Sequence, residues 1–257
     1  MIKLVATDLD GTFLNETRGL MTGAEELLDE LEQKQIAFVA ASGRSLRSIE
    51  RVFGDEVVNK IGIVAENGSV VAYKGTVINV CQLDIHMASE IATLLLDMKV
   101  NPLVNTVHNS FSSATSIEFN KNISYYCSNL THVDSFSQVP DEVVKIAINV
   151  PSGETLPVYN TLMEKWGDQT AIAISGDYWL DVMPKATNKS VGLEILLDKL
   201  GINSEEIVTF GDYDNDIELL KLGKYSYAMI HANDRVKKHA KAVCEQTEIF
   251  NKIRALI

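Results

Sequence analysis

Ile2-Lys-Leu-Val-Ala-Thr7, an apolar run at the start of the chain, leads directly into Asp8-Leu-Asp-Gly-Thr12. The run is aliphatic, partly β-branched and short, which predicts a buried strand. The aspartates and the glycine then indicate a turn at its carboxyl end. Because open parallel sheets bind ligands beyond the carboxyl ends of their strands, carboxylates at this point favour a functional site. An ordinary strand-to-turn junction, in which Asp and Gly are common, is the alternative.

Strand and helix patterns alternate after this turn. Thr22-Gly-Ala-Glu25 is typical of a capping box that opens a helix reaching about Lys34. Apolar runs at 36–41 and 61–65 predict two more strands, and a helix is expected between them from about residue 45 to 53. Buried strands that alternate with amphipathic helices predict an α/β fold with a Rossmann-like parallel sheet covered on both faces.

The same alternation returns near the end of the chain. Helices are expected at 187–200, 215–222 and 234–240, with strands at 207–210 and 225–230. The middle differs, because its segments are longer and more polar and its connections, such as 101–116 and 127–137, are rich in Asn and Ser. Helices at 87–99 and 156–166 alternate there with strand-like runs at 144–150 and 171–174. These patterns predict a core of residues 1–82 and 184–257 and an inserted α+β domain of residues 83–183.

Composition narrows the class of protein. The chain has 257 residues, a net charge of -12 and 46% hydrophobic residues, so it can form a sizeable core. An acidic surface repels phosphate backbones and anionic lipid, which argues against nucleic acid and membrane partners. Cys81, Cys127 and Cys244 are scattered, which suits neither a disulfide framework nor a zinc site. Reduced thiols are expected and the first residues do not form a signal peptide, which favours a cytoplasmic protein. The sequence gives no sign of an obligate protein partner.

Polar groups fall at the ends of three predicted strands. Asp8 and Asp10 follow the first strand, Ser42 follows the second, and the third is followed by Asp212, Asn215 and Asp216. Four carboxylates at one edge of a sheet would repel one another, and a divalent cation resolves this. Oxygen ligands without His or Cys favour Mg²⁺ before Ca²⁺ and argue against zinc.

Each of these signals has a structural alternative. An acidic first turn also stabilises a helix N-terminus, which would explain 211–216 without a metal. A calcium loop is excluded there, because Ile217 and Gly223 stand where it needs Gly and Glu. Ser42 could cap the following turn. Lys189 lies in the first turn of the helix expected from 187, where a cation opposes the helix dipole, so either a bound anion explains it or it is an exposed, solvated lysine.

Four segments in this order resemble the haloacid dehalogenase superfamily: Asp8-Leu-Asp-Gly-Thr12, Ala41-Ser-Gly-Arg44, Lys189 and Gly211-Asp-Tyr-Asp-Asn-Asp216. Three more look like its Cof-type sugar phosphatases: Gly11-Thr-Phe-Leu-Asn15, Val64-Ala-Glu-Asn-Gly68 and Tyr225-Ser-Tyr-Ala-Met229. The match covers nearly the whole chain, and the ordered set is specific although each piece alone is not.

The resemblance implies a phosphatase that acts on small phosphorylated metabolites, with sugar phosphates as the expected substrates, and it implies a mobile cap. Asp8 would be the nucleophile that forms an aspartyl-phosphate, and Asp10 would protonate the leaving alkoxide and then deprotonate water. The residues implied in phosphate or substrate binding are Ser42, Gly43, Arg44, Lys189 and Asn215.

The resemblance also implies a Mg²⁺ site. Its ligands would be Asp8, the main-chain carbonyl of Asp10, and Asp212. Asp216 would act through water or by orienting Lys189.

The chain departs from the family where Ile230-His231 replaces the usual Gly-Asn pair, and where the stretch after Cys244 lacks a Gly-containing turn. His231 is therefore a candidate substrate contact, as are His108, Asp177 and Tyr178 in the insert, although each is also explained as an ordinary loop residue. Two other functions stay open: a phosphomutase or other phosphotransferase using the same aspartyl-phosphate, and a non-catalytic phospho-accepting switch.

Overall fold

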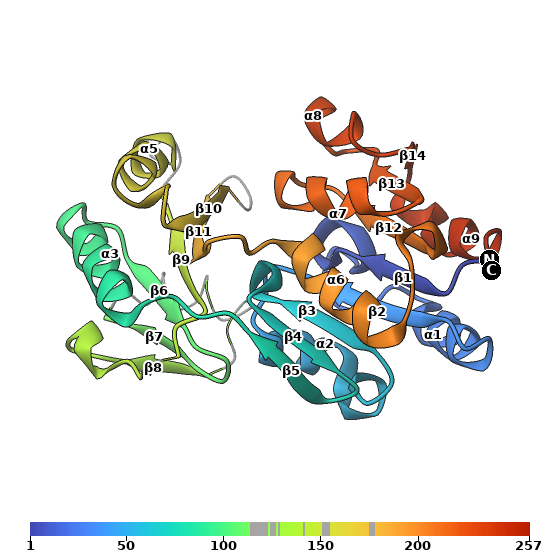
Figure 1. The fold of residues 1–257 in the computed structure, drawn as a ribbon, viewed down its shortest axis with the longest axis horizontal. Helices are drawn as coiled ribbons and strands as arrows, with labels where there is room; N and C mark the ends of the chain where they lie inside the picture. Colours follow the sequence, from blue (N-terminus) through green and yellow to red (C-terminus); the bar gives the residue numbers. More distant parts are fainter. Residues whose placement is uncertain (114–122, 124–126, 128, 141, 151–154, 175–177) are drawn as a thin grey trace.

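A computed structural model describes residues 1–113, 123, 127, 129–140, 142–150, 155–174 and 178–257. It consists of two lobes, each built on its own sheet, and both chain ends lie together at the far side of the larger lobe (Figure 1). The larger lobe is called the core and the smaller one the cap. Within the described part of the chain, no helix combines the length and the apolar character needed to span a membrane.

The core sheet has eight strands in the order β14-β13-β12-β1-β2-β3-β4-β5. Neighbours from β14 to β3 are parallel, whereas β4 and β5 join as an antiparallel edge. The strands are β1 (Leu4–Thr7), β2 (Ala37–Ala41), β3 (Gly62–Ala65), β4 (Val70–Tyr73), β5 (Thr76–Val80), β12 (Ile207–Gly211), β13 (Tyr225–Met229) and β14 (Ala242–Cys244). The α/β prediction is confirmed, and the β4–β5 hairpin and β14 are additions that it lacked.

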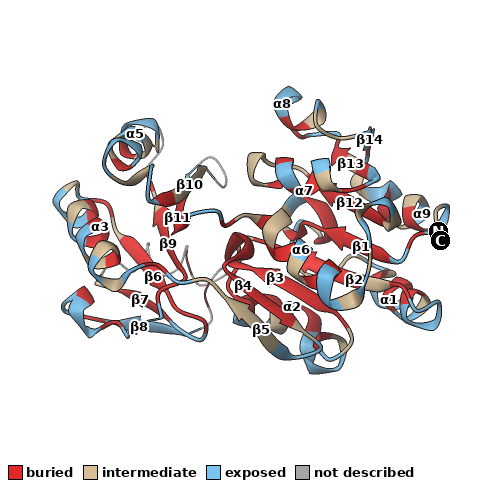
Figure 2. Cartoon of the chain, in the orientation of Figure 1, coloured by how far each residue is buried: buried red, intermediate tan, exposed pale blue. Residues whose placement is uncertain are grey.

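Helices cover both faces of this sheet, because alternate residues of each strand point to opposite sides. In β1, Val5 packs in the cluster that includes α1, α2 and α9, whereas Leu4 packs in the cluster that includes α6 and α7. The helices are α1 (Ala24–Gln33), α2 (Leu46–Val58), α6 (Lys189–Leu200), α7 (Ile217–Leu222), α8 (Asp234–Lys237) and α9 (Ile249–Arg254). Figure 2 shows the buried strands between exposed outer helix surfaces.

Two helix starts test the capping predictions. The capping box predicted at 22–25 is wrong, because Gly23, in a left-handed conformation (φ 88°), is the N-cap of α1 and no side chain caps it. In α2 the predicted start is confirmed, since the Ser45 side chain accepts a hydrogen bond from the Ser48 amide. That helix runs past its predicted end at Phe53 to Val58, with a break at Gly54 (φ 75°).

The cap contains a six-stranded sheet in the order β10-β11-β9-β6-β7-β8. Its strands are β6 (Pro102–Asn105), β7 (Ser110–Ser112), β8 (Leu130–His132), β9 (Lys145–Asn149), β10 (Thr170–Ile174) and β11 (Trp179–Pro184). Helices α3 (Ile85–Asp97) and α5 (Thr155–Trp166) bury Ile91, Leu95 and Leu162 against it. The interpretation of 101–116 and 127–137 as connections is wrong at 102–105, 110–112 and 130–132, because strands of three or four residues are too short to show a period.

Candidate active site

Asp8 and Asp10 lie on a tight turn that begins where β1 ends. The Asp8 amide donates to the Phe210 carbonyl at 2.9 Å, which ties this turn to the end of β12. Gly11 has φ 80°, and a Cβ atom there would lie 2.3 Å from Oδ2 of Asp212. A glycine is therefore required, both for the left-handed conformation and for the close approach of Asp212.

Lys189 begins α6 and reaches the same point from the other side. Asn188 caps this helix, since its Oδ1 accepts the amides of Ser190 and Val191 at 2.9 and 3.1 Å. The Lys189 side chain is 1% exposed, and its Nζ lies 2.6 Å from Oδ1 of Asp8 and 2.6 Å from Oδ1 of Asp216. Burial opposes the charge on this lysine, but the two carboxylates outweigh burial and raise its pKa. The interpretation of Lys189 as a solvated lysine is wrong.

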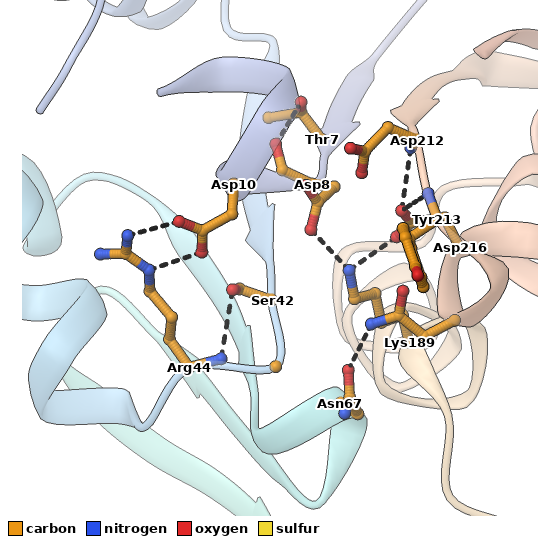
Figure 3. A network of polar contacts seen from close by, with 12 residues as sticks. Thr7, Asp8, Asp10, Ser42, Arg44, Asn67, Lys189, Asp212, Tyr213 and Asp216 are labelled. Carbon is orange, nitrogen blue, oxygen red and sulfur yellow. Dashed lines mark hydrogen bonds and ion pairs between the residues drawn. The ribbon is translucent and has the colours of Figure 1, made fainter. Parts of the chain in front are cut away.

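The loop after β12 supplies Asp212 and Asp216. Oδ2 of Asp216 accepts the amides of Asp212 and Tyr213, each at 3.0 Å, while its Oδ1 is held by Lys189. One ligand atom from each of Asp8, Asp212 and Asp216 lies within 4.8 Å of the others. Figure 3 shows these carboxylates and Lys189 pointing toward one another. Groups from opposite ends of the chain therefore meet, as the sequence predicted.

The electrostatics of this cluster favour a further positive charge. Burial raises the pKa of Asp8 well above its ordinary value, although Lys189 opposes the rise. Burial, followed by the charge of Asp216, raises the pKa of Asp212 to about 7. Oδ2 of Asp8 is buried and has no hydrogen-bond partner among the described residues. An orphaned carboxylate oxygen among all-oxygen donors fits a hard divalent cation.

Asp10 lies at the same edge but has a partner of its own. The Arg44 guanidinium binds it through two contacts, Nε to Oδ2 at 2.7 Å and Nη2 to Oδ1 at 2.6 Å. Such a paired arrangement fixes the orientation of a carboxylate better than a single contact does. Arg44 is buried, and both residues line a cavity between the two lobes. The pair therefore holds the Asp10 carboxylate at the edge of this cavity.

The loop after β2 carries the predicted phosphate-binding residues. Ser42 Oγ accepts the Arg44 amide at 3.2 Å, and the Ser42 carbonyl accepts the Asn67 amide at 3.0 Å. Asn215, across the site, donates through Nδ2 to Oδ1 of Asn67 at 2.9 Å. Asn67 thus links the two segments predicted to bind phosphate, a position that the sequence did not assign to it.

A cavity of about 230 Å³ lies between the lobes and opens onto these residues. It is lined by Asp8, Asp10, Ser42, Gly43, Arg44, Leu103, Asn105, Lys145, Ala147, Trp179, Asp181, Asp212, Tyr213 and Asn215. The cap therefore contributes residues that the sequence did not identify. One signal was present: Lys145 and Asp181 are charged residues within largely apolar strands, where charge is rare without a partner.

The candidate substrate contacts fall elsewhere. His108 and Tyr178 are exposed and are not among the described residues that line the cavity, and Asp177 lies outside the described residues. His231 Nε2 lies 3.0 Å from Oδ2 of Asp212, a candidate metal ligand, but His231 itself is not among the described residues that line the cavity.

Comparisons with known proteins agree with this geometry. The family model described as haloacid dehalogenase-like hydrolase matches residues 5–251. The chain is 31% identical over 249 residues to 5-amino-6-(5-phospho-D-ribitylamino)uracil phosphatase YbjI of Escherichia coli (strain K12), covering 93% of this chain and 89% of that protein.

Solved structures share the whole fold. The crystal structure of SMU.1108c from Streptococcus mutans UA159 has a TM-score of 0.91 at 26% identity, covering 99% of this chain and 100% of that chain. The HAD subclass IIB sugar phosphatase BT4131 has a TM-score of 0.86 at 22% identity, covering 99% and 100%, a likeness of fold alone. With the family model matching almost end to end, the chain belongs to the haloacid dehalogenase-like hydrolases and is a phosphatase of their Cof type.

Proposed function

We propose that the protein is a Mg²⁺-dependent phosphatase that hydrolyses small phosphorylated metabolites, above all sugar phosphates, through an aspartyl-phosphate on Asp8. One observation carries this proposal: a buried carboxylate, Asp8, has one oxygen held by Lys189 and the other without a partner among the described residues, at the edge of a cavity. We also propose a cytoplasmic enzyme that needs no nucleic acid, membrane or obligate protein partner.

The reaction would proceed in two steps. An oxygen of Asp8 attacks phosphorus, and the bond from phosphorus to the substrate alcohol breaks while Asp10 gives that alcohol its proton. Water then attacks the phosphorus of the aspartyl-phosphate, Asp10 takes a proton from the water, and phosphate leaves Asp8 free. A covalent intermediate divides one hard displacement into two easier ones. Arg44, through its paired contact, would hold Asp10 toward the leaving oxygen.

Lys189, Ser42, Gly43 and Asn215 would hold the phosphoryl oxygens. Lys189 supplies charge, while the others border the cavity and offer hydrogen-bond donors. Asn67 would keep the amide of Asn215 in place through the 2.9 Å contact.

A charge count supports the metal. When all four are ionised, Asp8, Asp10, Asp212 and Asp216 carry four negative charges against two positive charges on Lys189 and Arg44, so a phosphate dianion would be repelled. Asp8, Asp212 and the main-chain carbonyl of Asp10 would hold Mg²⁺. Asp216 accepts hydrogen bonds from Lys189 and two amides, and it would act through water or by orienting Lys189. The ion would neutralise the phosphoryl oxygens.

The first test replaces Asp8 with Asn. We expect Asp8→Asn to fold, because it removes a buried charge, and to lose phosphate release by more than ~10⁴-fold, because the nucleophile is gone. The measurements are the melting temperature and phosphate release from a panel of sugar phosphates. That panel should include 5-amino-6-(5-phospho-D-ribitylamino)uracil, on which the Escherichia coli relative is named to act. Near-wild-type turnover in the variant contradicts the mechanism.

The second test removes the metal. We expect EDTA to abolish turnover and added Mg²⁺ to restore it, and calorimetry to show Mg²⁺ binding that Asp212→Asn weakens by at least about tenfold. Asp234→Asn, an exposed carboxylate of the same lobe that is not part of the cluster, is the matched control. Turnover that EDTA leaves unchanged rules out the metal. Release of phosphate without an added acceptor distinguishes a phosphatase from a phosphotransferase.

A further inference from the structure

The turn Glu66-Asn67-Gly68 supplies no group that touches the reacting atoms in the reaction proposed above, yet it is buried and strained. Glu66 and Asn67 are 1% exposed and adopt φ of 50° and 53°, a left-handed conformation that is unusual for Glu. Their amides donate to the carbonyls of Arg44 and Ser42, at 2.9 and 3.0 Å. Strain of this kind persists where the surroundings fix a functional position. The turn therefore stands directly behind the phosphate-binding loop.

Lys145, from β9 of the cap, faces Glu66 across the boundary between the lobes. Its ammonium lies 2.7 Å from Oε2 of Glu66 and 3.4 Å from Oδ1 of Asp181, and it also donates to the Gly43 carbonyl. An ammonium has three N–H donors, so these acceptors occupy all of them. Lys145 lines the cavity but has no donor left for a phosphate.

This trio also carries an excess of negative charge. Two carboxylates, Glu66 and Asp181, meet the single ammonium of Lys145, and all three side chains are at most 5% exposed. One negative charge is left over within the trio. Because buried charges are poorly screened, a second anionic group on a ligand would be repelled from this end of the cavity.

Two buried acceptors beside the trio lack donors. Asn105, on β6, donates through Nδ2 to Oε2 of Glu66 at 3.3 Å. Since a carboxylate accepts, the amide nitrogen must face Glu66, which leaves Oδ1 of Asn105 for another partner. Neither this Oδ1 nor Oε1 of Glu66 has a donor in the part of the chain that the structure describes. Asn105 is 3% exposed and lines the cavity, so a ligand there is the natural source of a donor.

The remaining cap wall of the cavity is apolar. Leu103, Ala147 and Trp179 line it and pack against one another. Ligand sites commonly combine such an apolar wall with a few polar groups that fix orientation. A sugar or polyol matches both parts, because its C–H edge suits the apolar wall and its hydroxyls donate to buried acceptors.

We propose that Glu66, Asn105, Lys145 and Asp181 form the subsite for the alcohol part of the substrate, and that it selects an uncharged, hydroxyl-rich alcohol over one with a second anionic group. This inference rests on the proposed phosphatase function and narrows its substrate class to neutral sugar or polyol monophosphates. Sugar acid phosphates and bisphosphates are rejected.

Matched ligands test the charge selection. Glucitol 6-phosphate and 6-phosphogluconate share a carbon chain and differ in a terminal hydroxymethyl or carboxylate, as do ribitol 5-phosphate and 5-phosphoribonate; n-hexyl phosphate lacks the hydroxyls. Calorimetry with Asp8→Asn and Mg²⁺ measures binding without turnover, so it decides the subsite even if hydrolysis fails. We expect at least one polyol phosphate to bind about tenfold more tightly than its acid and than hexyl phosphate. Asp181→Asn should shrink the difference within that pair. Equal affinities within both pairs overturn the proposal.

A cap variant tests the hydroxyl acceptors. Asn105→Ala should weaken the preferred polyol phosphate about tenfold, the effect of one lost hydrogen bond, and change hexyl phosphate by less than about twofold. Asn149→Ala, also in the cap sheet but not lining the cavity, is the matched control and should change neither. Equal losses for both ligands in Asn105→Ala overturn the proposal. If that variant does not fold, Asp181→Asn decides. Loss of turnover in the wild type with binding preferences intact would count against the proposed phosphatase alone.

Discussion

The positive charge of Lys189 is unfavourable at the start of a helix, and this conflict is visible in the sequence. A cation at the first position of a helix opposes the dipole, so an anion nearby was predictable. The structure supplies Asp8 and Asp216, both 2.6 Å from its Nζ. Asn67 gave no such signal, because asparagine in a turn is ordinary. Its link between Asn215 and Asp181 depends on the meeting of three segments distant in sequence.

Asp212 makes stability depend on pH in a direction that can be predicted. Its pKa rises from an ordinary 3.8 to about 7 in the folded protein. Between these values the folded state binds more protons than the unfolded chain, so stability falls as pH rises through the window. A metal competes with the same protons and binds more tightly as they leave. We expect a fixed Mg²⁺ concentration, ~100 times the dissociation constant measured at pH 8, to raise the melting temperature by about 5–10 °C near pH 8. The same concentration should raise it by less near pH 5.5.

Asp212→Asn provides the control for that experiment. Without the titrating carboxyl, both the loss of metal-free stability with rising pH and the gain from Mg²⁺ should become smaller. Melting curves with and without Mg²⁺ at the two pH values measure both effects. An equal gain from Mg²⁺ at both pH values would contradict the coupling between proton and metal.

Among the secondary-structure elements, those with strong hydrophobic patterns were predictable and short ones were not. The interior core strands have continuous apolar runs, and β1, β2, β3 and β12 lie within about two residues of their predicted bounds. The short strands β6 and β7 follow no clear pattern, since three or four residues do not establish a period. The helix from 234 ends at Lys237, earlier than expected, because local patterns locate helix ends poorly.

Helix α6 must pack closely because it positions Lys189. A Cβ atom on Gly192 would lie 2.5 Å from Cγ1 of Val64 and 3.1 Å from Cα of Gly68. Gly192→Ala would ordinarily favour a helix by about 0.5–1 kcal/mol, but overpacking costs about 1–3 kcal/mol. We expect net destabilisation of about 1 kcal/mol, measured by urea unfolding, together with reduced turnover as Lys189 shifts. Glu194→Ala, on the exposed side of α6, should stay within about 0.5 kcal/mol of wild type. A stabilised Gly192→Ala would contradict this packing argument.

For the whole molecule, the sequence predicted an α/β core and an insert from their different compositions, but not how the two lobes touch. Their contact depends on residues that lie on different sheets, such as Glu66 in the core and Lys145 in the cap. A sequence pattern identifies which face of one element is buried. It does not identify the partner across a boundary between lobes. The identity of the cap residues that line the cavity therefore emerged only from the structure.

Removing the cation at the boundary between the lobes should change the overall shape of the molecule. Lys145→Met would leave Glu66 and Asp181 buried without their cation, and breaking a buried ion pair in this way costs about 3–5 kcal/mol. Movement of the cap away from the core would let both carboxylates regain water. We therefore expect a larger radius of gyration by small-angle scattering and a lower melting temperature. Lys99→Met, at an exposed cap position, should change neither.

A compensated variant separates charge from packing. Adding Glu66→Gln and Asp181→Asn to Lys145→Met removes all three charges, so the boundary no longer holds an uncompensated carboxylate. Replacing a buried ionic group by neutral side chains of similar size is often neutral for stability. We expect the triple variant to recover the compact scattering profile and most of the lost melting temperature. If the triple variant stays as open as Lys145→Met, then the shape of Lys145, and not the charge balance across the boundary, holds the lobes together.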